Sequence, residues 1–127
     1  MLAVDDDVLV LMNTAAMLED EGHTVIEAMS GAQALSVLRA GETVDLVITD
    51  QAMPGMTGVE LAQTIKAEWP HLPIVMATGY AELPAGARAD LVRLSKPFTQ
   101  AQLSEMVTEA IRPKSTLGKI ASFFRSA

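Results

Sequence analysis

The chain has 127 residues, of which half are hydrophobic and a fifth are charged, and it contains no cysteine. This size and composition indicate one globular domain and exclude structural disulfides, thiolate metal sites and cysteine nucleophiles. The net charge of −7 argues against a nucleic-acid-binding surface and against attachment to an anionic membrane. No apolar run approaches the roughly 20 residues of a membrane span, and no signal peptide is evident, so we expect a cytoplasmic protein.

Strand-like and helix-like segments alternate along the chain. Strands are indicated by short apolar, β-branched runs, and helices by apolar residues at a spacing of three and four. In chain order we expect a strand at 2–4, a helix at 8–21, a strand at 23–28, a helix at 30–41, a strand at 44–49, a helix at 58–69, strands at 72–78 and 91–95, and a helix at 99–112. Ser30 and Thr99 are expected helix N-caps, and Asp7 is positioned to cap the first helix.

The first predicted helix carries an apolar stripe that we expect to face the core, formed by Val8, Leu11, Met12, Ala15 and Leu18. The segment 44–49 is rich in apolar and β-branched residues, with Asp45 as its one charged residue. Such a run is typical of a strand covered on both faces. Alternating strands and helices predict parallel strands joined by right-handed crossovers. The expected fold is therefore an open, doubly wound α/β sheet with the flavodoxin-like strand order 2-1-3-4-5.

Polar residues follow four of these strands. Asp5 and Asp6 come after the first, Asp50 after the third, Thr78 after the fourth and Lys96 after the fifth. Taken singly, each is most simply a turn or cap residue or a solvated side chain. Together they are expected at one sheet edge, because ligands of such sheets bind outside the carboxyl ends of the strands.

A group of carboxylates in one crevice repels itself, and a bound dication removes that repulsion. Oxygen ligands without histidine or cysteine favour Mg²⁺ over zinc. A lysine and a hydroxyl at the same edge add a second cation and a hydrogen-bond donor. Such a set is suited to stabilising a phosphoryl group around one carboxylate.

Four segments carry a resemblance to a known family: "AVDDD", "LVITDQAMPGMTGVEL", "IVMATGYAE" and "LSKPFT". In this order they resemble the signature blocks of the receiver domain of two-component response regulators and hybrid sensor kinases. The resemblance covers residues 2–112 and implies a CheY-like five-stranded fold. It also implies a role in phosphorelay signalling and no enzymatic output.

The resemblance implies a role for three residues in phosphoryl transfer. Asp50 is similar to the phosphoacceptor, which attacks a phosphohistidine on a histidine kinase or phosphotransfer protein. Thr78 is similar to the hydroxyl residue that hydrogen-bonds the phosphoryl group. Lys96 is similar to the lysine that pairs first with the aspartate and then with its phosphate.

The resemblance also implies a metal site. Asp5 and Asp6 are similar to the acid pair that holds Mg²⁺, with Asp50 and the main-chain carbonyl of Ala52 as further ligands. The peptide before Pro97 is expected to be cis. Ala52 and Tyr80 stand where the family tunes loss of the phosphate, and because the Ala52 methyl cannot orient a water, we expect slow hydrolysis.

The chain departs from the family between Thr78 and Lys96, where the short spacing and "GYAELPAGARADL" predict a shortened or irregular fourth helix. We expect a receiver domain at 1–112 and a tail at 113–127. In the tail Leu117, Ile120, Ala121 and Phe124 repeat at helical spacing. For the tail we consider three alternatives: a helix packed on its own domain, a partner-contacting or homodimer-forming helix, and a disordered remnant.

Two other functions are considered. A haloacid-dehalogenase-like phosphohydrolase also uses a strand-end aspartate with Mg²⁺, but it requires an acid at position 52 and a cap domain. A degenerate receiver that serves only as an interaction module would not need all five of Asp5, Asp6, Asp50, Thr78 and Lys96. The resemblance therefore favours a stand-alone receiver or one excised from a hybrid kinase.

Overall fold

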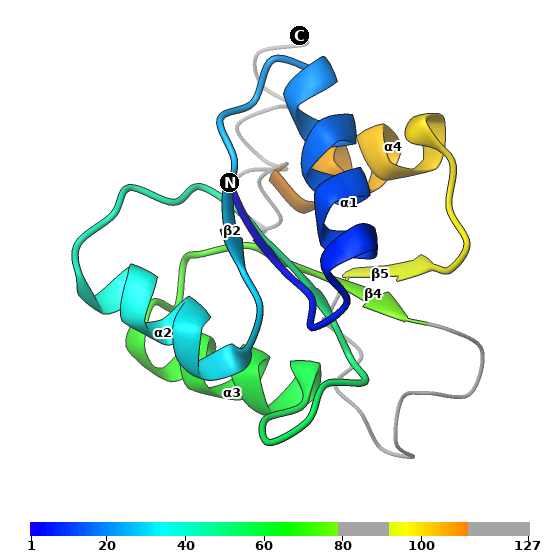
Figure 1. Ribbon diagram of the computed structural model, residues 1–127. Helices are drawn as coiled ribbons and strands as arrows, with labels where there is room; N and C mark the ends of the chain where they lie inside the picture. Colours follow the sequence, from blue (N-terminus) through cyan, green and yellow to red (C-terminus); the bar gives the residue numbers. More distant parts are fainter. Residues whose placement is uncertain (79–91, 112–127) are drawn as a thin grey trace, which may run out of the picture.

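The structure is a computed structural model in which residues 1–78 and 92–111 are described (Figure 1). Its centre is a five-stranded sheet formed by β1 (Leu2–Val4), β2 (Ile26–Ala28), β3 (Val47–Asp50), β4 (Ile74–Thr78) and β5 (Val92–Ser95). The helices are α1 (Val8–Asp20), α2 (Gly31–Arg39), α3 (Gly58–Glu68) and α4 (Gln100–Ile111). The strands are parallel and lie in the order β2-β1-β3-β4-β5, which confirms the predicted topology.

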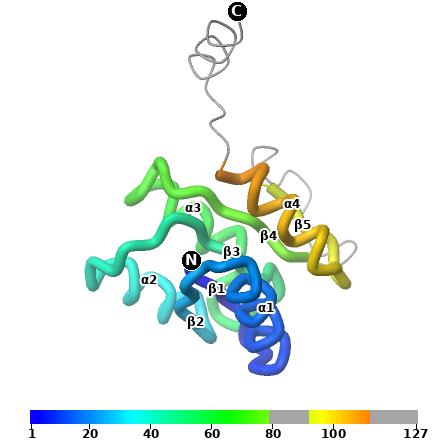
Figure 2. The backbone as a smooth tube through the Cα atoms, turned by 90° about the horizontal axis from the view of Figure 1, so that it is seen from above, coloured from blue at the N-terminus to red at the C-terminus, as the bar shows by residue number. Residues whose placement is uncertain are grey.

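The helices form a layer on each face of the sheet (Figure 2). One hydrophobic cluster joins α2 and α3 to Leu2, Val4 and Val47, and the other joins α1 and α4 to Ala3 and Ile48. This alternation along β1 and β3 follows from the opposite directions of successive side chains in a strand. Every residue of β3 is buried, as predicted for a strand covered on both faces.

The strands are shorter than predicted at their amino ends. β2 begins at Ile26 and β3 at Val47. Both residues pair with Leu2, the first residue of the three-residue strand β1, so neither strand has a partner in β1 before that point. β3 also extends one residue further than predicted, since Asp50 pairs with Ala77 of β4. The pairing register, which apolar runs do not encode, sets these bounds.

The predicted helix caps are confirmed. Asp7 Oδ1 accepts hydrogen bonds from the backbone N–H groups of Leu9 and Val10, at 3.0 and 3.3 Å. Ser30 caps α2 in the same way, and Thr99 and Gln102 exchange reciprocal hydrogen bonds at the start of α4. Asp7 is therefore a cap, as its position before the first helix predicted.

The predicted apolar stripe of α1 is wrong in part. Three of its members are buried: Leu11, Ala15 and Leu18. Val8 and Met12 are instead 48% and 57% exposed, and Thr14 is buried in their place. Because α1 is apolar on several faces, periodicity alone did not identify the face that packs against the sheet and α4.

Three predictions concern parts of the chain outside the described residues. These are the shortened fourth helix within 79–91, the contribution of Tyr80, and the helical tail at 113–127. Each of them stays a prediction.

Candidate functional site

The predicted site residues meet at the carboxyl edge of the sheet. Asp5 follows β1 directly, Asp50 ends β3, Thr78 ends β4, and Lys96 follows β5 directly. β1, β3, β4 and β5 are consecutive neighbours in the sheet, so four residues from distant parts of the sequence share one edge. Asp5, Asp50 and Thr78 are buried, with 5–7% of their surface exposed.

Lys96 connects two of the carboxylates. Its Nζ donates a hydrogen bond to Asp50 Oδ1 at 2.5 Å and lies 3.6 Å from Asp5 Oδ2. The Lys96 backbone N–H donates to the Thr78 carbonyl at 2.9 Å, which fixes the point at which the lysine leaves the sheet. The Lys96–Pro97 peptide is cis, as the resemblance implied. The lysine therefore compensates part of the charge of two buried acids.

Three carboxylates form a cluster at this edge. One oxygen from each of Asp5, Asp6 and Asp50 lies within 4.8 Å of the others. Burial raises the pKa of the Asp5 carboxyl above its usual value. The Asp7 backbone N–H, which donates to Asp5 at 2.9 Å, acts against that rise, and the charges of Asp50 and Asp6 add to it.

The residues of this cluster fit a divalent cation. They supply oxygen atoms alone, the donors that Mg²⁺ prefers. Among the described residues, the three carboxylates have one cation, Lys96, in contact with two of them, so the edge has excess negative charge that a dication would neutralise. Asp6 is exposed, which leaves the cluster open to solvent on one side.

Gln51 is a residue beside Asp50 whose structural role the sequence analysis missed. It is 6% exposed, and its Oε1 accepts a hydrogen bond from the Val59 backbone N–H at 2.8 Å. Its carbonyl accepts from the N–H groups of Met53 and Gly58, at 3.1 and 3.0 Å. Gln51 thus ties the loop after Asp50 to the first turn of α3. One signal in the sequence could have identified Gln51. It is a polar residue between a buried strand and the start of a helix, and the first N–H groups of a helix need acceptors.

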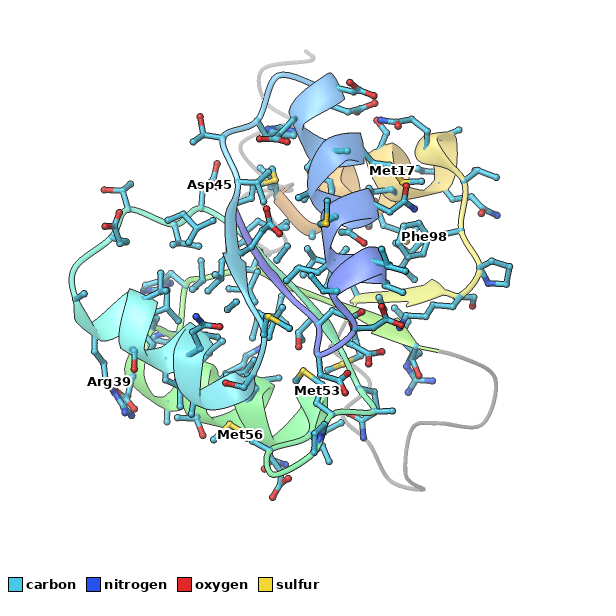
Figure 3. All side chains as sticks on the ribbon, viewed as in Figure 1. Met17, Arg39, Asp45, Met53, Met56 and Phe98 are labelled. Carbon is cyan, nitrogen blue, oxygen red and sulfur yellow. The ribbon has the colours of Figure 1, made fainter. Side chains whose placement is uncertain are left out.

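The loop from Gln51 to Thr57 is also anchored by packing. Met53 is buried in the core cluster of α2 and α3, and Met56 packs on Gly31 at the start of α2 (Figure 3). A side chain at Gly58 would overlap the Asp50 carbonyl oxygen, so α3 begins in close contact with the end of β3. Ala52 is exposed within this anchored loop, two residues after Asp50.

An apolar groove adjoins the acid cluster. It lies between α1 and the segment after β5, has a volume of about 450 Å³, and is lined by Leu9, Val10, Asn13, Lys96, Pro97 and Phe98, among others. Figure 3 shows Phe98 beside α1. Val8, Leu9 and Met12 are 48%, 73% and 57% exposed, so the start of α1 presents apolar surface close to Asp5 and Asp6.

The chain matches the family model of the response regulator receiver domain over residues 1–108. It belongs to this family. Receiver domains are signalling modules of two-component systems. The fold and the family agree with the sequence resemblance.

Relatives of this receiver domain occur both alone and within longer proteins. It is 35% identical over 121 residues to a chemotaxis protein CheY homolog of Campylobacter jejuni, covering 87% of this chain and 91% of that protein. It is 36% identical over 117 residues to the sensor kinase CckA of Brucella abortus, covering 87% of this chain and 12% of the kinase. The chain thus spans a small part of CckA.

A solved receiver protein from Sinorhizobium medicae superposes with a TM-score of 0.78 at 33% identity, covering 87% of this chain and 91% of that one. The receiver domain of the hybrid histidine kinase CckA superposes with a TM-score of 0.72 at 28% identity, covering 87% of this chain and 96% of that domain. Among the described residues, no helix has the length and apolar character needed to cross a bilayer.

Proposed function

We propose that this receiver domain accepts a phosphoryl group on Asp50 from a phosphohistidine of a histidine kinase or phosphotransfer protein. The observation that supports this most strongly is the set of contacts around Asp50. A buried carboxylate at a strand end is held by Lys96 at 2.5 Å and belongs to a cluster with two further acids. Neither a turn nor a helix cap requires this set.

In the proposed step an Asp50 carboxylate oxygen attacks the phosphorus atom. Oδ1 is engaged by Lys96, so Oδ2 is the attacking atom. The new O–P bond forms as the P–N bond to the donor imidazole breaks, and the electron pair returns to the imidazole nitrogen, which is then protonated. The product is an acyl phosphate. Positioning and charge compensation are the main requirements of such a transfer.

Asp5, Asp6, Asp50 and the main-chain carbonyl of Ala52 are the proposed ligands of a Mg²⁺ ion. When bound, the ion supplies positive charge for the phosphoryl oxygens. The fit rests on the all-oxygen donor set and on the spacing of the three carboxylates. Gln51 supports the site indirectly, because it holds the loop that carries Ala52.

Lys96 and Thr78 complete the proposed site. Lys96 pairs with Asp50 before transfer and with the phosphoryl group after it. Thr78 lies on β4, the strand next to Asp50, one residue beyond Ala77, the register partner of Asp50. We assign the Thr78 hydroxyl a hydrogen bond to a phosphoryl oxygen. The acyl phosphate carries about −1.5 to −2 charges in place of the single charge of the Asp50 carboxylate, which shifts the population of conformations of this edge.

The groove beside α1 is the proposed contact surface for the phosphodonor. A phosphohistidine must approach Asp50 from the carboxyl edge, and the exposed Val8, Leu9 and Met12 border that approach. An amphipathic helix bearing the histidine would cover these side chains and the groove lined by Pro97 and Phe98. Contact and transfer would then use one continuous surface.

We further propose that the receiver domain comprises residues 1–112 and that 113–127 form a separate tail. The family match over 1–108 supports this boundary. The domain is proposed to act as a signalling module without a catalysed reaction on a separate substrate. A cytoplasmic location and a homodimer stay predictions.

Incubation of the protein with acetyl phosphate and Mg²⁺, followed by intact-mass measurement, tests the proposal. We expect one added phosphoryl group, lost in Asp50→Asn and retained in the matched variant Asp45→Asn, which alters an exposed acid at the opposite edge. Rapid release of phosphate without an adduct would indicate a phosphohydrolase. Absence of both adduct and turnover would indicate an interaction module.

A further inference from the structure

A second pocket lies at the opposite edge of the sheet from Asp50. It has a volume of about 460 Å³ and is formed where α2 and α3 end and where β3 and β4 are about to begin. Apolar residues line most of it, among them Leu38, Val44, Trp69, Leu72 and Pro73. Trp69, the only tryptophan of the chain, is partly exposed there. An apolar pocket of this size at the protein surface is suited to apolar side chains.

The border of this pocket is acidic. Glu42, Asp45 and Glu68 line it, and Figure 3 shows Arg39 beside α3. Arg39 pairs with Glu68 at 2.6 Å, and the amino terminus lies 3.5 Å from Asp45. Within residues 1–78 and 92–111, Glu42 has no ion-pair partner. The pocket therefore combines an apolar interior with one border acid, Glu42, that no ion pair compensates within these residues, a surface that favours a cationic, apolar segment.

Residues 112–127 have this chemistry. They contain four basic residues, Arg112, Lys114, Lys119 and Arg125, and no acid, whereas all sixteen acids of the chain lie before them. The rest of the chain thus has five basic residues against sixteen acids. Leu117, Ile120, Ala121 and Phe124 follow the spacing of an apolar helix stripe in this segment.

The segment begins near the edge of the sheet that holds the pocket. α4 runs back from the carboxyl edge toward the edge where the strands begin, and its described part ends at Ile111 (Figure 1). Residues 112–116 give an extended reach of roughly 20 Å from Ile111 to Leu117. The docked stripe therefore has to begin within that distance of Ile111.

We propose that the pocket between the ends of α2 and α3 is a docking site for the chain's own segment 117–125. The apolar stripe of Leu117, Ile120 and Phe124 occupies the pocket and covers Trp69. Arg125, which flanks this stripe at helical spacing, faces the acidic border at Glu42. This inference is independent of phosphoryl transfer, since the pocket and Asp50 lie at opposite edges of the sheet.

Trp69 provides a direct readout in the full-length chain. We expect Phe124→Ser to shift its emission maximum to longer wavelength and to increase its quenching by acrylamide. The matched control is Phe123→Ser, which removes the same side chain from a position outside the stripe and is expected to leave Trp69 unchanged. Equal effects of the two variants, or no effect of Phe124→Ser, would overturn the proposal.

Charge exchange provides a second test. Glu42→Lys and Arg125→Glu are each expected to increase quenching of Trp69, and the double variant to restore the wild-type value. Glu19→Lys, which changes an exposed acid on α1, is the control and should have no effect. Failure of the double variant to restore the signal contradicts the pairing.

Dilution distinguishes the possible occupants. Docking of the chain's own segment predicts a Trp69 signal independent of protein concentration, together with a monomer mass. A signal that weakens on dilution identifies a second copy as the occupant and overturns the proposal. Tail variants that alter binding to anionic vesicles but leave Trp69 unchanged identify a membrane as the partner and overturn it equally.

Discussion

Lys96 and Asp50 are in direct contact across the end of β4, with 2.5 Å between Nζ and Oδ1. The contact joins the end of β5 to the end of β3. Lys96 also lies 3.6 Å from Asp5, so one ammonium group compensates acids from two strands. This arrangement gives the carboxyl edge of the sheet both its stability and its proposed chemistry.

Replacing Lys96 by alanine is expected to lower the stability of the metal-free protein. It leaves Asp5 and Asp50 without their cation, at a cost of about 1–3 kcal/mol in free energy of unfolding, between the values for exposed and buried pairs. Thermal unfolding with and without Mg²⁺ measures the effect, which the ion should reduce. Lys96→Arg keeps the positive charge and should lower the free energy of unfolding by less than Lys96→Ala. Unchanged stability in Lys96→Ala would contradict the assigned role.

Replacing Asp5 by asparagine is expected to stabilise the metal-free protein and to weaken Mg²⁺ binding. Burial raises the pKa of Asp5 in the folded state, so its ionisation lowers stability at pH values above that pKa. The advantage of Asp5→Asn should be full at pH values above the raised pKa and should shrink as the pH falls toward the usual value of 3.8. Calorimetric titration should show Mg²⁺ affinity lower by about ten- to a hundredfold.

Gly58→Ala is expected to destabilise the protein more than Gly31→Ala. Both glycines are the first residue of a helix, so the gain in helix propensity on replacement by alanine is similar at the two positions and cancels in the comparison. A methyl at Gly58 meets the Asp50 carbonyl and the Gln51 backbone, whereas one at Gly31 meets only the flexible Met56 side chain. Overpacking against backbone costs about 1–3 kcal/mol. Chemical denaturation of both variants measures the difference, and equal losses would contradict the close contact of α3 with β3.

Ala52→Asn is expected to shorten the lifetime of the phosphorylated protein. Ala52 is exposed in the loop held by Gln51, and its methyl group cannot position a water molecule for attack on the phosphate. An amide at this position can do so. The half-life of the adduct, followed by intact mass after removal of acetyl phosphate, measures the effect. A wild-type half-life no longer than that of the variant would contradict the expectation.

The sequence predicted the strand order and the residues at the strand ends because both follow from the pattern itself. Asp5, Asp50, Thr78 and Lys96 each come at the end of an apolar run, and parallel strands place such ends at one edge. Helix caps were equally local, since Ser30 and Thr99 bond to backbone a few residues away. These features require no knowledge of the packing.

Features that depend on packing were missed or wrong. Val8 and Met12 of α1 were predicted to be buried, but the stripe centred on Leu11 and Leu18 packs inward instead. Gln51 was overlooked because a polar side chain is expected at the surface. The N–H groups of Val59, which donates to its side chain, and of Gly58, which donates to its carbonyl, become its neighbours only after folding. The first residues of β2 and β3 were predicted too early, because both strands begin where they pair with the short β1.

The most direct test of the central claim is to map the phosphorylated residue. Protein treated with acetyl phosphate and Mg²⁺ is reduced with borohydride, which converts an aspartyl phosphate to homoserine, and its peptides are sequenced by mass spectrometry. We predict homoserine at position 50 alone, dependent on Mg²⁺ and absent from Asp50→Asn. Homoserine at another aspartate in the wild-type protein, or none at all under conditions in which a known receiver domain is modified, would contradict the account.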